Sequence, residues 1–212
     1  MQRELIVARD FPAEAAAFIA ALAPRTLALA GGETPRPVYA RLVDAPLPWP
    51  EIDVFFGDER CVSADDPASN YRMAWTALLA RVPARVHPLT GCDPDAAEAE
   101  LRRVFGAGVP VLDLGTDGHT ASLFPGDPAL DVTDRLVVRV RRPDHERLSL
   151  TLPVLSAAKV ALFLVTGAEK RTALASLLAG DIPAARVTAQ RIVVIADVAA
   201  AGDGAPGQGG QS

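Results

Sequence analysis

Residues 26–42 read TLALAGGETPRPVYARL and contain one complete unit of the predicted fold. Thr26–Ala30 is short and mostly apolar, as expected of a strand that is buried in a parallel sheet. Gly31 and Gly32 then allow the backbone to turn tightly, and a helical stretch, Pro35–Leu42, follows. The sequence therefore predicts a strand, a turn and a helix in succession, which is the repeating unit of an α/β protein.

The same alternation extends along the chain in both directions from this unit. Apolar runs typical of strands alternate with Ala- and Leu-rich stretches typical of helices. Further strands are predicted at Leu5–Ala8, Asp53–Phe56, Val109–Leu114, Leu136–Val140, Leu148–Leu152, Val160–Val165 and Arg191–Ala196. Further helices are predicted at Pro12–Leu22, Asn70–Leu79, Pro94–Phe105 and Glu169–Leu178. The expected fold class is α/β, a single-domain Rossmann-like parallel sheet with helices on both faces.

Length and composition indicate one domain. The chain has 212 residues, of which 50% are hydrophobic, and this is enough for one substantial core. We expect a domain over residues 1–199 and a disordered glycine-rich tail over residues 200–212, because so polar a segment cannot offset its ordering entropy. The apolar runs are shorter than the roughly 20 residues of a membrane span, and no secretory signal is recognised, so we expect a cytoplasmic protein without membrane contact.

Charge and cysteine content exclude other classes. The formal net charge of −5 disfavours a nucleic-acid partner, because binding to phosphates along a nucleic acid requires a basic surface. Cys61 and Cys92 have no CxxC spacing and no companion histidine, so we expect two free thiols and neither a zinc site nor a disulfide. An anionic ligand would need a local positive pocket.

The turn at Gly31 and Gly32 is a candidate anion site. Glycines expose backbone N–H groups, the following helix start adds partial positive charge, and Thr34 can donate its hydroxyl. The pattern is neither GxGxxG nor a P-loop, so it does not indicate a nucleotide. An ordinary turn between strand and helix explains it equally well, and Glu33 must point away from any bound phosphate.

Charged residues follow several predicted strands. Asp58 and Arg60 come directly after Asp53–Phe56, at the end of the strand where open α/β sheets bind their ligands. Arg147 and Lys170 lie at the edges of later strands and could complete an anion site. Judged singly, each of these residues is better explained as a solvated surface group.

The stretch DGHTASLFPG, residues 117–126, places a histidine in a loop at a strand end. His119 is suited to proton transfer near neutral pH, and Asp117 could orient its ring. Ser122 lacks the GxSxG context of a nucleophile. The loop therefore favours acid–base chemistry carried by His119.

Taken in order, six segments of the chain resemble the motifs of the 6-phosphogluconolactonase family: GGETP, FFGDER, NYRM, DGHTASLFPG, RLSLTLPVL and VTGAEK. The resemblance covers residues 27–178. It implies a Rossmann-like fold and hydrolysis of 6-phospho-D-glucono-1,5-lactone to 6-phosphogluconate in the pentose phosphate pathway. We expect the phosphorylated sugar lactone as the ligand, and we expect no metal, no cofactor and no stable protein partner.

The resemblance also implies residue roles. His119 would be the catalytic residue, Asp58 and Arg60 would face the sugar, and Asp117 would orient the imidazole or shape its loop. The residues expected to bind the phosphate are Gly31, Gly32, Thr34, Arg147 and Lys170.

Three positions depart from the family pattern. Glu33 occupies the place of the serine in the family's GGSTP turn. The family pattern LGxGxDGH, which ends at the histidine, is matched here only from Gly115 onward, and Asp113 stands where its first glycine is expected. The stretch Gly91–Asp113 is also short for the family. Two alternatives stay open at this stage: an enzyme similar to glucosamine-6-phosphate deaminase/isomerase, or a non-catalytic sugar-phosphate-binding domain. The related deaminases carry a glutamate five positions after the histidine, where this chain has Phe124, and this favours lactone hydrolysis.

Overall fold

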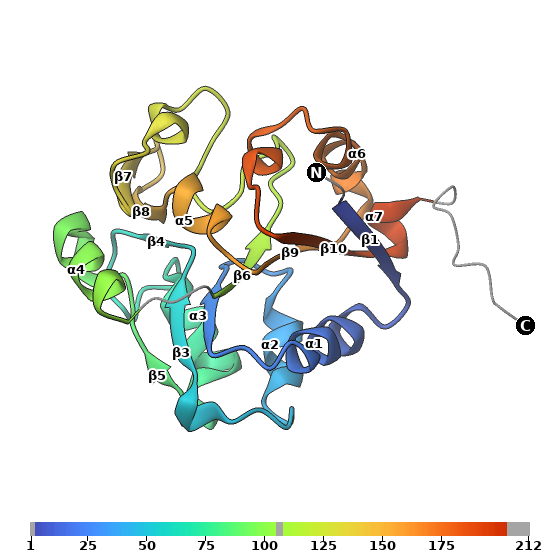
Figure 1. Ribbon diagram of the computed structural model, residues 1–212, viewed down its shortest axis with the longest axis horizontal. Helices are drawn as coiled ribbons and strands as arrows, with labels where there is room; N and C mark the ends of the chain where they lie inside the picture. The colour runs from blue at the N-terminus through green and yellow to red at the C-terminus, as the bar shows by residue number, and fades with distance from the viewer. Residues whose placement is uncertain (1–2, 105–107, 203–212) are drawn as a thin grey trace, which may run out of the picture.

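In the computed structural model, the described part of the chain forms two β-sheets (Figure 1). The structure describes residues 3–104 and 108–202. The large sheet has seven strands, and all of its strand pairs are parallel. In spatial order they are β1 (Arg3–Ala8), β10 (Arg191–Asp197), β9 (Val160–Val165), β6 (Val109–Asp113), β2 (Thr26–Leu29), β3 (Asp53–Phe56) and β5 (Arg85–Val86).

Helices lie on both faces of the large sheet, with α1 and α2 below β9 and β10 in Figure 1 and α6 above them. The α-helices are α1 (Phe11–Ala21), α2 (Arg36–Leu42), α3 (Asn70–Ala77), α4 (Pro94–Val104), α5 (Leu152–Ser156), α6 (Arg171–Ala179) and α7 (Val198–Ala201). The short 3-10 helices are η1 (Trp49–Glu51), η2 (Leu79–Arg81), η3 (Thr90–Cys92), η4 (Pro128–Asp131), η5 (Ala168–Lys170) and η6 (Pro183–Arg186). The predicted α/β fold class is confirmed, and no helix within the described residues has the length and apolar character to cross a membrane.

The central strands are buried on both sides. Every residue of β2 and β3 is buried, as are the last five residues of β9. A parallel sheet is covered by helices on both faces, so its strands appear in sequence as continuous apolar runs. Helix α1 begins where the Asp10 side chain accepts a hydrogen bond from Ala13 N, and it buries Phe11, Ala15 and Ile19 along one stripe.

Two predicted strands belong to a different sheet. Leu136–Val140 and Leu148–Leu152 were expected in the parallel sheet, but they form β7 (Val137–Arg141) and β8 (Glu146–Leu150) of a three-stranded antiparallel sheet. The exposed Arg139 and Arg141 alternate with buried valines along β7, which is the pattern of a strand with one face in solvent. The third strand, β4 (Asp58–Arg60), is absent from the predicted strands.

This small sheet, at the upper left of Figure 1, positions charged residues beside the large one. Gly57 alone separates β3 from β4, so the chain passes directly from one sheet into the other. In the antiparallel pairing of β4 with β8, Asp58 lies opposite Ser149 and Arg60 lies opposite Arg147. The two arginines are thereby brought together although they are far apart in the sequence.

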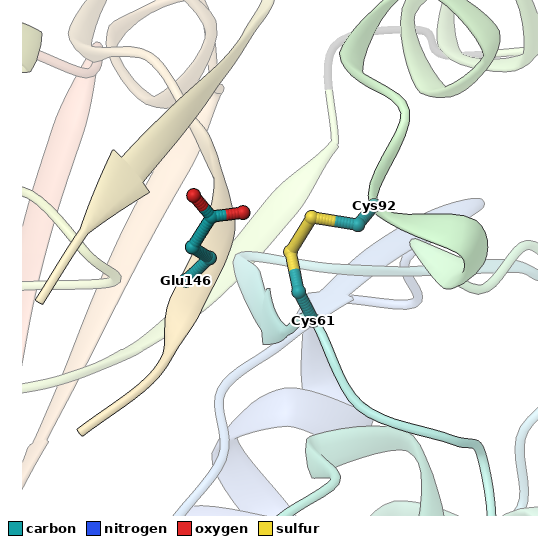
Figure 2. Close-up of side chains that lie close together, drawn as sticks. All are labelled: Cys61, Cys92 and Glu146. Atoms are coloured by element: carbon teal, nitrogen blue, oxygen red, sulfur yellow. A yellow bond between two sulfur atoms is a disulfide. The ribbon is translucent and has the colours of Figure 1, made fainter.

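The expectation of two free thiols is wrong, because Cys61 and Cys92 form a disulfide (Figure 2). Cys61 N donates to the Glu146 carbonyl on β8, and this places Cys61 beside the turn that precedes α4. The Cα atoms of the two cysteines are 5.1 Å apart, within the range that a disulfide spans. Spacing along the sequence contains no information about this approach, which depends on the path of β4 past β8.

The C-terminal boundary is only partly described. Asp197 caps α7 by accepting a hydrogen bond from Ala200 N, and α7 includes Ala200 and Ala201 from the stretch predicted as a tail. Residues 203–212, the greater part of that stretch, lie outside the described residues.

Candidate active site

A small cavity of about 80 Å³ lies at the carboxyl ends of β2, β3 and β6. Parallel α/β sheets place their ligands at this edge. The lining residues are Ala30, Gly31, Gly32, Asp58, Arg60, Asn70, Asp113, His119, Ala121 and Arg147. A larger cavity of about 580 Å³ lies between α2 and α3, but its lining residues include no histidine or carboxylate, so we assign the chemistry to the smaller one.

The glycine turn fits closely against its neighbours. A Cβ atom at position 31 would lie 1.8 Å from Asn70 Oδ1, and Gly32 adopts a φ of +93°, which residues with side chains rarely take. Glu33 points away, since its side chain is 81% exposed and pairs with Arg36 at 3.0 Å. The requirement that Glu33 leave the turn free is therefore met.

Asp58 is held in place by two side chains at the back of the cavity. Its Oδ2 accepts a hydrogen bond from Ser122 Oγ at 2.6 Å, and its Oδ1 accepts one from Asn70 Nδ2 at 3.2 Å. Asp58, Ser122 and Asn70 are all buried. This arrangement gives Ser122 a positioning role and leaves the Asp58 carboxylate with both oxygens engaged.

Glu59, the next residue in GDER, faces away from this chemistry. Its carboxylate accepts hydrogen bonds from Asn70 N and Tyr71 N at 2.8 and 2.7 Å and so caps the first turn of α3. Burial raises the pKa of Glu59 even though these hydrogen bonds oppose the rise. The motif is therefore divided between a structural glutamate and two residues, Asp58 and Arg60, that line the cavity.

Several polar atoms of the cavity residues have no protein partner. Among the described residues, five buried side-chain N or O atoms are unpaired, and three of these are Asn70 Oδ1, Arg60 Nε and Arg147 Nε. Leaving such a group unsatisfied costs about 1–3 kcal/mol. Such a concentration around one cavity is expected of a site that binds a polar ligand.

The histidine loop is tightly closed. Gly115 N donates to the His119 carbonyl at 2.8 Å, and Thr120 Oγ1 donates to the Asp113 carbonyl at 2.9 Å. A Cβ atom on Gly115 would lie only 2.1 Å from His119 Nδ1. The absence of a side chain at Gly115 therefore leaves the space that the imidazole occupies.

Asp117 orients the His119 ring. Its Oδ1 lies 2.5 Å from Nδ1 of the ring and accepts a hydrogen bond from the His119 backbone N at 3.1 Å. Burial acts to raise the pKa of Asp117, but the two hydrogen bonds from His119 outweigh it and hold the pKa below its usual value. A carboxylate on Nδ1 favours the tautomer that leaves Nε2 free to accept a proton. This is the geometry of a general base.

The chain matches the family model described as glucosamine-6-phosphate isomerases/6-phosphogluconolactonase over residues 4–196. The chain belongs to this family. A relative named 6-phosphogluconolactonase from Synechocystis is 43% identical over 173 residues, which are 74% of this chain and 72% of the relative. One from Caulobacter vibrioides is 41% identical over 180 residues, or 76% of each chain. The crystal structure of 6-phosphogluconolactonase from Thermotoga maritima has a TM-score of 0.83 at 27% identity and covers 92% of this chain and 100% of that one.

Within the glucosamine-6-phosphate isomerase/6-phosphogluconolactonase family, the residue five positions after the histidine is informative. Here it is Phe124, whose ring centroid lies 4.4 Å from that of His119. Phe124 is buried, and Arg142 lies over its ring at 4.2 Å. An apolar ring occupies the place where the sequence pattern of the deaminases has a carboxylate.

The predicted site residues fall into two groups. Gly31, Gly32, Asp58, Arg60, His119 and Arg147 line the cavity. The other three lie behind it: Asp117 supports His119, Thr34 Oγ1 is 3.1 Å from Thr166 Oγ1, and Lys170 Nζ donates to the Leu114 carbonyl at 2.5 Å.

Sequence reasoning missed two polar lining residues, Asn70 and Asp113. Asn70 lies in the quoted motif NYRM, so its position in the resemblance was available as a signal. Asp113 was interpreted only as part of a strand and as a departure from the family pattern. A carboxylate at the end of a buried central strand is itself a signal that such a residue faces a ligand.

Proposed function

We propose that the protein hydrolyses 6-phospho-D-glucono-1,5-lactone to 6-phosphogluconate, a step of the pentose phosphate pathway. The observation that carries this proposal is the His119–Asp117 pair beside a cavity lined by Arg60 and Arg147. The family membership and the 6-phosphogluconolactonase names of the relatives support it. A phosphorylated sugar acid is too strongly charged to cross a bilayer unaided, so the enzyme must act in the compartment where its substrate forms, and we propose that this is the cytoplasm.

The reaction needs one proton acceptor and a stabiliser of negative charge. His119 Nε2 removes a proton from a water molecule as the water attacks the lactone carbonyl carbon. The carbonyl oxygen becomes negatively charged in the tetrahedral intermediate, where Arg60 can donate to it. The intermediate then collapses, the bond to the ring oxygen breaks, and the imidazolium returns its proton to that oxygen. One water is consumed and His119 ends in its starting state.

The phosphate group is assigned to the residues around the glycine turn. Gly31 and Gly32 offer backbone N–H groups at one wall of the cavity, and Arg147 lines another. Thr34 and Lys170 lie just behind, each held by one hydrogen bond to the end of a neighbouring strand or loop. These residues give the phosphate a positive and donor-rich environment, as an anionic group requires.

The decisive experiment is the rate of 6-phosphogluconolactone hydrolysis above the spontaneous rate. His119→Ala should lower kcat by about 10²- to 10⁴-fold, which is the usual contribution of a general base. His145→Ala is the matched control, because His145 Nδ1 also lies near an aspartate oxygen, at 3.4 Å, but His145 does not line the cavity. Its kcat should stay close to that of the wild type.

Two parallel substrates separate the alternatives. Unphosphorylated gluconolactone should be hydrolysed poorly if the phosphate is recognised. Turnover of glucosamine 6-phosphate without lactone hydrolysis would instead indicate a deaminase or isomerase, and binding of 6-phosphogluconate with no turnover would indicate a non-catalytic binding domain. Undiminished kcat in the His119→Ala variant would refute the mechanism.

A further inference from the structure

Asp113 places an acidic group inside the cavity at a point where the family resemblance leads to the expectation of glycine. It is the last residue of β6, and it lines the cavity together with the glycine turn. Its Oδ2 lies 3.6 Å from the position that a Cβ atom on Gly32 would occupy. The carboxylate therefore faces the inner side of the turn.

Asp113 differs from Asp58, the other carboxylate that lines the cavity, in having an oxygen to spare. Both Asp58 oxygens accept hydrogen bonds from side chains. Asp113 Oδ1 accepts a hydrogen bond from Leu114 N at 2.8 Å, but Oδ2 has no hydrogen-bond partner among the described residues. Among the side-chain oxygens that line the cavity, Asn70 Oδ1 is also unpaired within the described residues.

The groups around Asp113 indicate that its free oxygen pairs with a hydrogen-bond donor of the ligand. Burial raises the pKa of Asp113, while the positive charge of Lys170 opposes that rise. A phosphate group at neutral pH presents oxygen acceptors, so an acidic oxygen next to it is repulsive. The hydroxyl groups of a sugar, by contrast, are hydrogen-bond donors and match an unpaired carboxylate oxygen.

We propose that Asp113 is a specificity-determining residue that accepts, through Oδ2, a hydrogen bond from a hydroxyl group of the bound sugar. This inference deepens the proposed function, because its ligand is the phosphorylated sugar acid or lactone. It assigns the phosphate to the hydrogen-bond donors of the cavity and at least one hydroxyl to Asp113.

The test is a comparison of two ligands by isothermal titration calorimetry. 6-Phosphogluconate carries hydroxyls and a phosphate, whereas inorganic phosphate carries no sugar hydroxyls. Asp113→Ala should weaken binding of 6-phosphogluconate by about 10- to 100-fold, which is typical of losing one hydrogen bond to a charged group. Binding of inorganic phosphate should be unchanged or tighter, because a negative charge has been removed. Asp113→Asn should lose less affinity for 6-phosphogluconate, since its amide oxygen still accepts.

Glu33→Ala is the matched control for charge. It removes one negative charge next to the same turn, but its side chain is exposed and paired with Arg36. Its affinity for 6-phosphogluconate should not fall. Thermal unfolding of each variant, with Asp113→Asn as the least disruptive change, separates loss of contact from loss of fold.

Three results would overturn the inference. One is 6-phosphogluconate binding in Asp113→Ala that is as tight as in the wild type or tighter, which would make Asp113 a purely repulsive group. The second is an equal loss of affinity for both ligands, which would indicate a packing role. The third is a wild type that does not bind 6-phosphogluconate. A wild type that binds 6-phosphogluconate but hydrolyses no lactone would refute the proposed function alone.

Discussion

Replacing Gly115 by alanine should impair catalysis although residue 115 carries no functional group. The added Cβ atom would lie 2.1 Å from His119 Nδ1 and 2.6 Å from Asp117 Oδ1. Ordinary contacts begin at 3.4 Å, so the imidazole must move by about 1.3 Å, the difference between 3.4 and 2.1 Å. The hydrogen bond that orients the ring, at 2.5 Å, cannot persist through this movement.

The size of the effect follows from the displacement. A misplacement of about 1 Å in a reacting group can lower the rate by about 10²-fold, so kcat for the phosphorylated lactone should fall by about that factor. Release of acid from 6-phosphogluconolactone, measured against the spontaneous rate, gives kcat directly. Gly57→Ala is the control, because the nearest heavy atom to its added Cβ is 3.7 Å away. A folded Gly115→Ala protein with wild-type kcat would show that His119 does not act from the position described.

Three further changes test other parts of the structure. Gly31→Ala should raise KM about tenfold, because the new Cβ would lie 1.8 Å from Asn70 Oδ1 and would displace the Asn70 side chain. In the double variant, Asn70→Ala should then raise KM little further, since both changes remove the same contact. Reduction of the disulfide should lower the unfolding free energy by about 4 kcal/mol, as expected for a sequence separation of 31, and urea titration of Cys61→Ser should show the same loss without a reductant. The hydrogen bond from Arg85 holds the pKa of Asp53 below its usual value. The ionised Asp53 therefore stabilises the folded state above about pH 4, and this stabilisation is lost as the pH falls further. The urea midpoint of Asp53→Asn should depend less on pH in that range than the midpoint of the wild type.

The large sheet could be predicted because its signal is local. Strands β3 and β9 coincide with the apolar runs Asp53–Phe56 and Val160–Val165, and burial on both faces makes such runs continuous. Runs of this kind do not reveal which sheet a strand joins. The alternation of arginines with valines along β7 contained that information, and it indicated an antiparallel strand with one face in solvent.

The residues that were missed depend on contacts between distant segments. The disulfide forms because β4 passes beside β8, which brings Cys61 toward Cys92. Asn70 enters the cavity because its amide reaches Asp58, 12 positions earlier in the chain. In both cases the residue types are visible in the sequence, whereas the approach is created only when the chain passes from the large sheet into the small one.

The path of the chain from the large sheet into the small one also explains the positive charge of the site. Arg60 and Arg147 lie directly opposite each other on β4 and β8, and like charges in such a pair destabilise a sheet. Each arginine is only partly compensated: Arg60 donates to the Ala68 carbonyl at 2.7 Å, Arg147 pairs with Asp144, and both Nε atoms stay unpaired. A pair that weakens the isolated fold stabilises a complex in which an anion lies beside it. The small sheet therefore brings two arginines together beside the parallel sheet. Their mutual repulsion destabilises the free protein, and binding of a negatively charged ligand offsets that loss of stability.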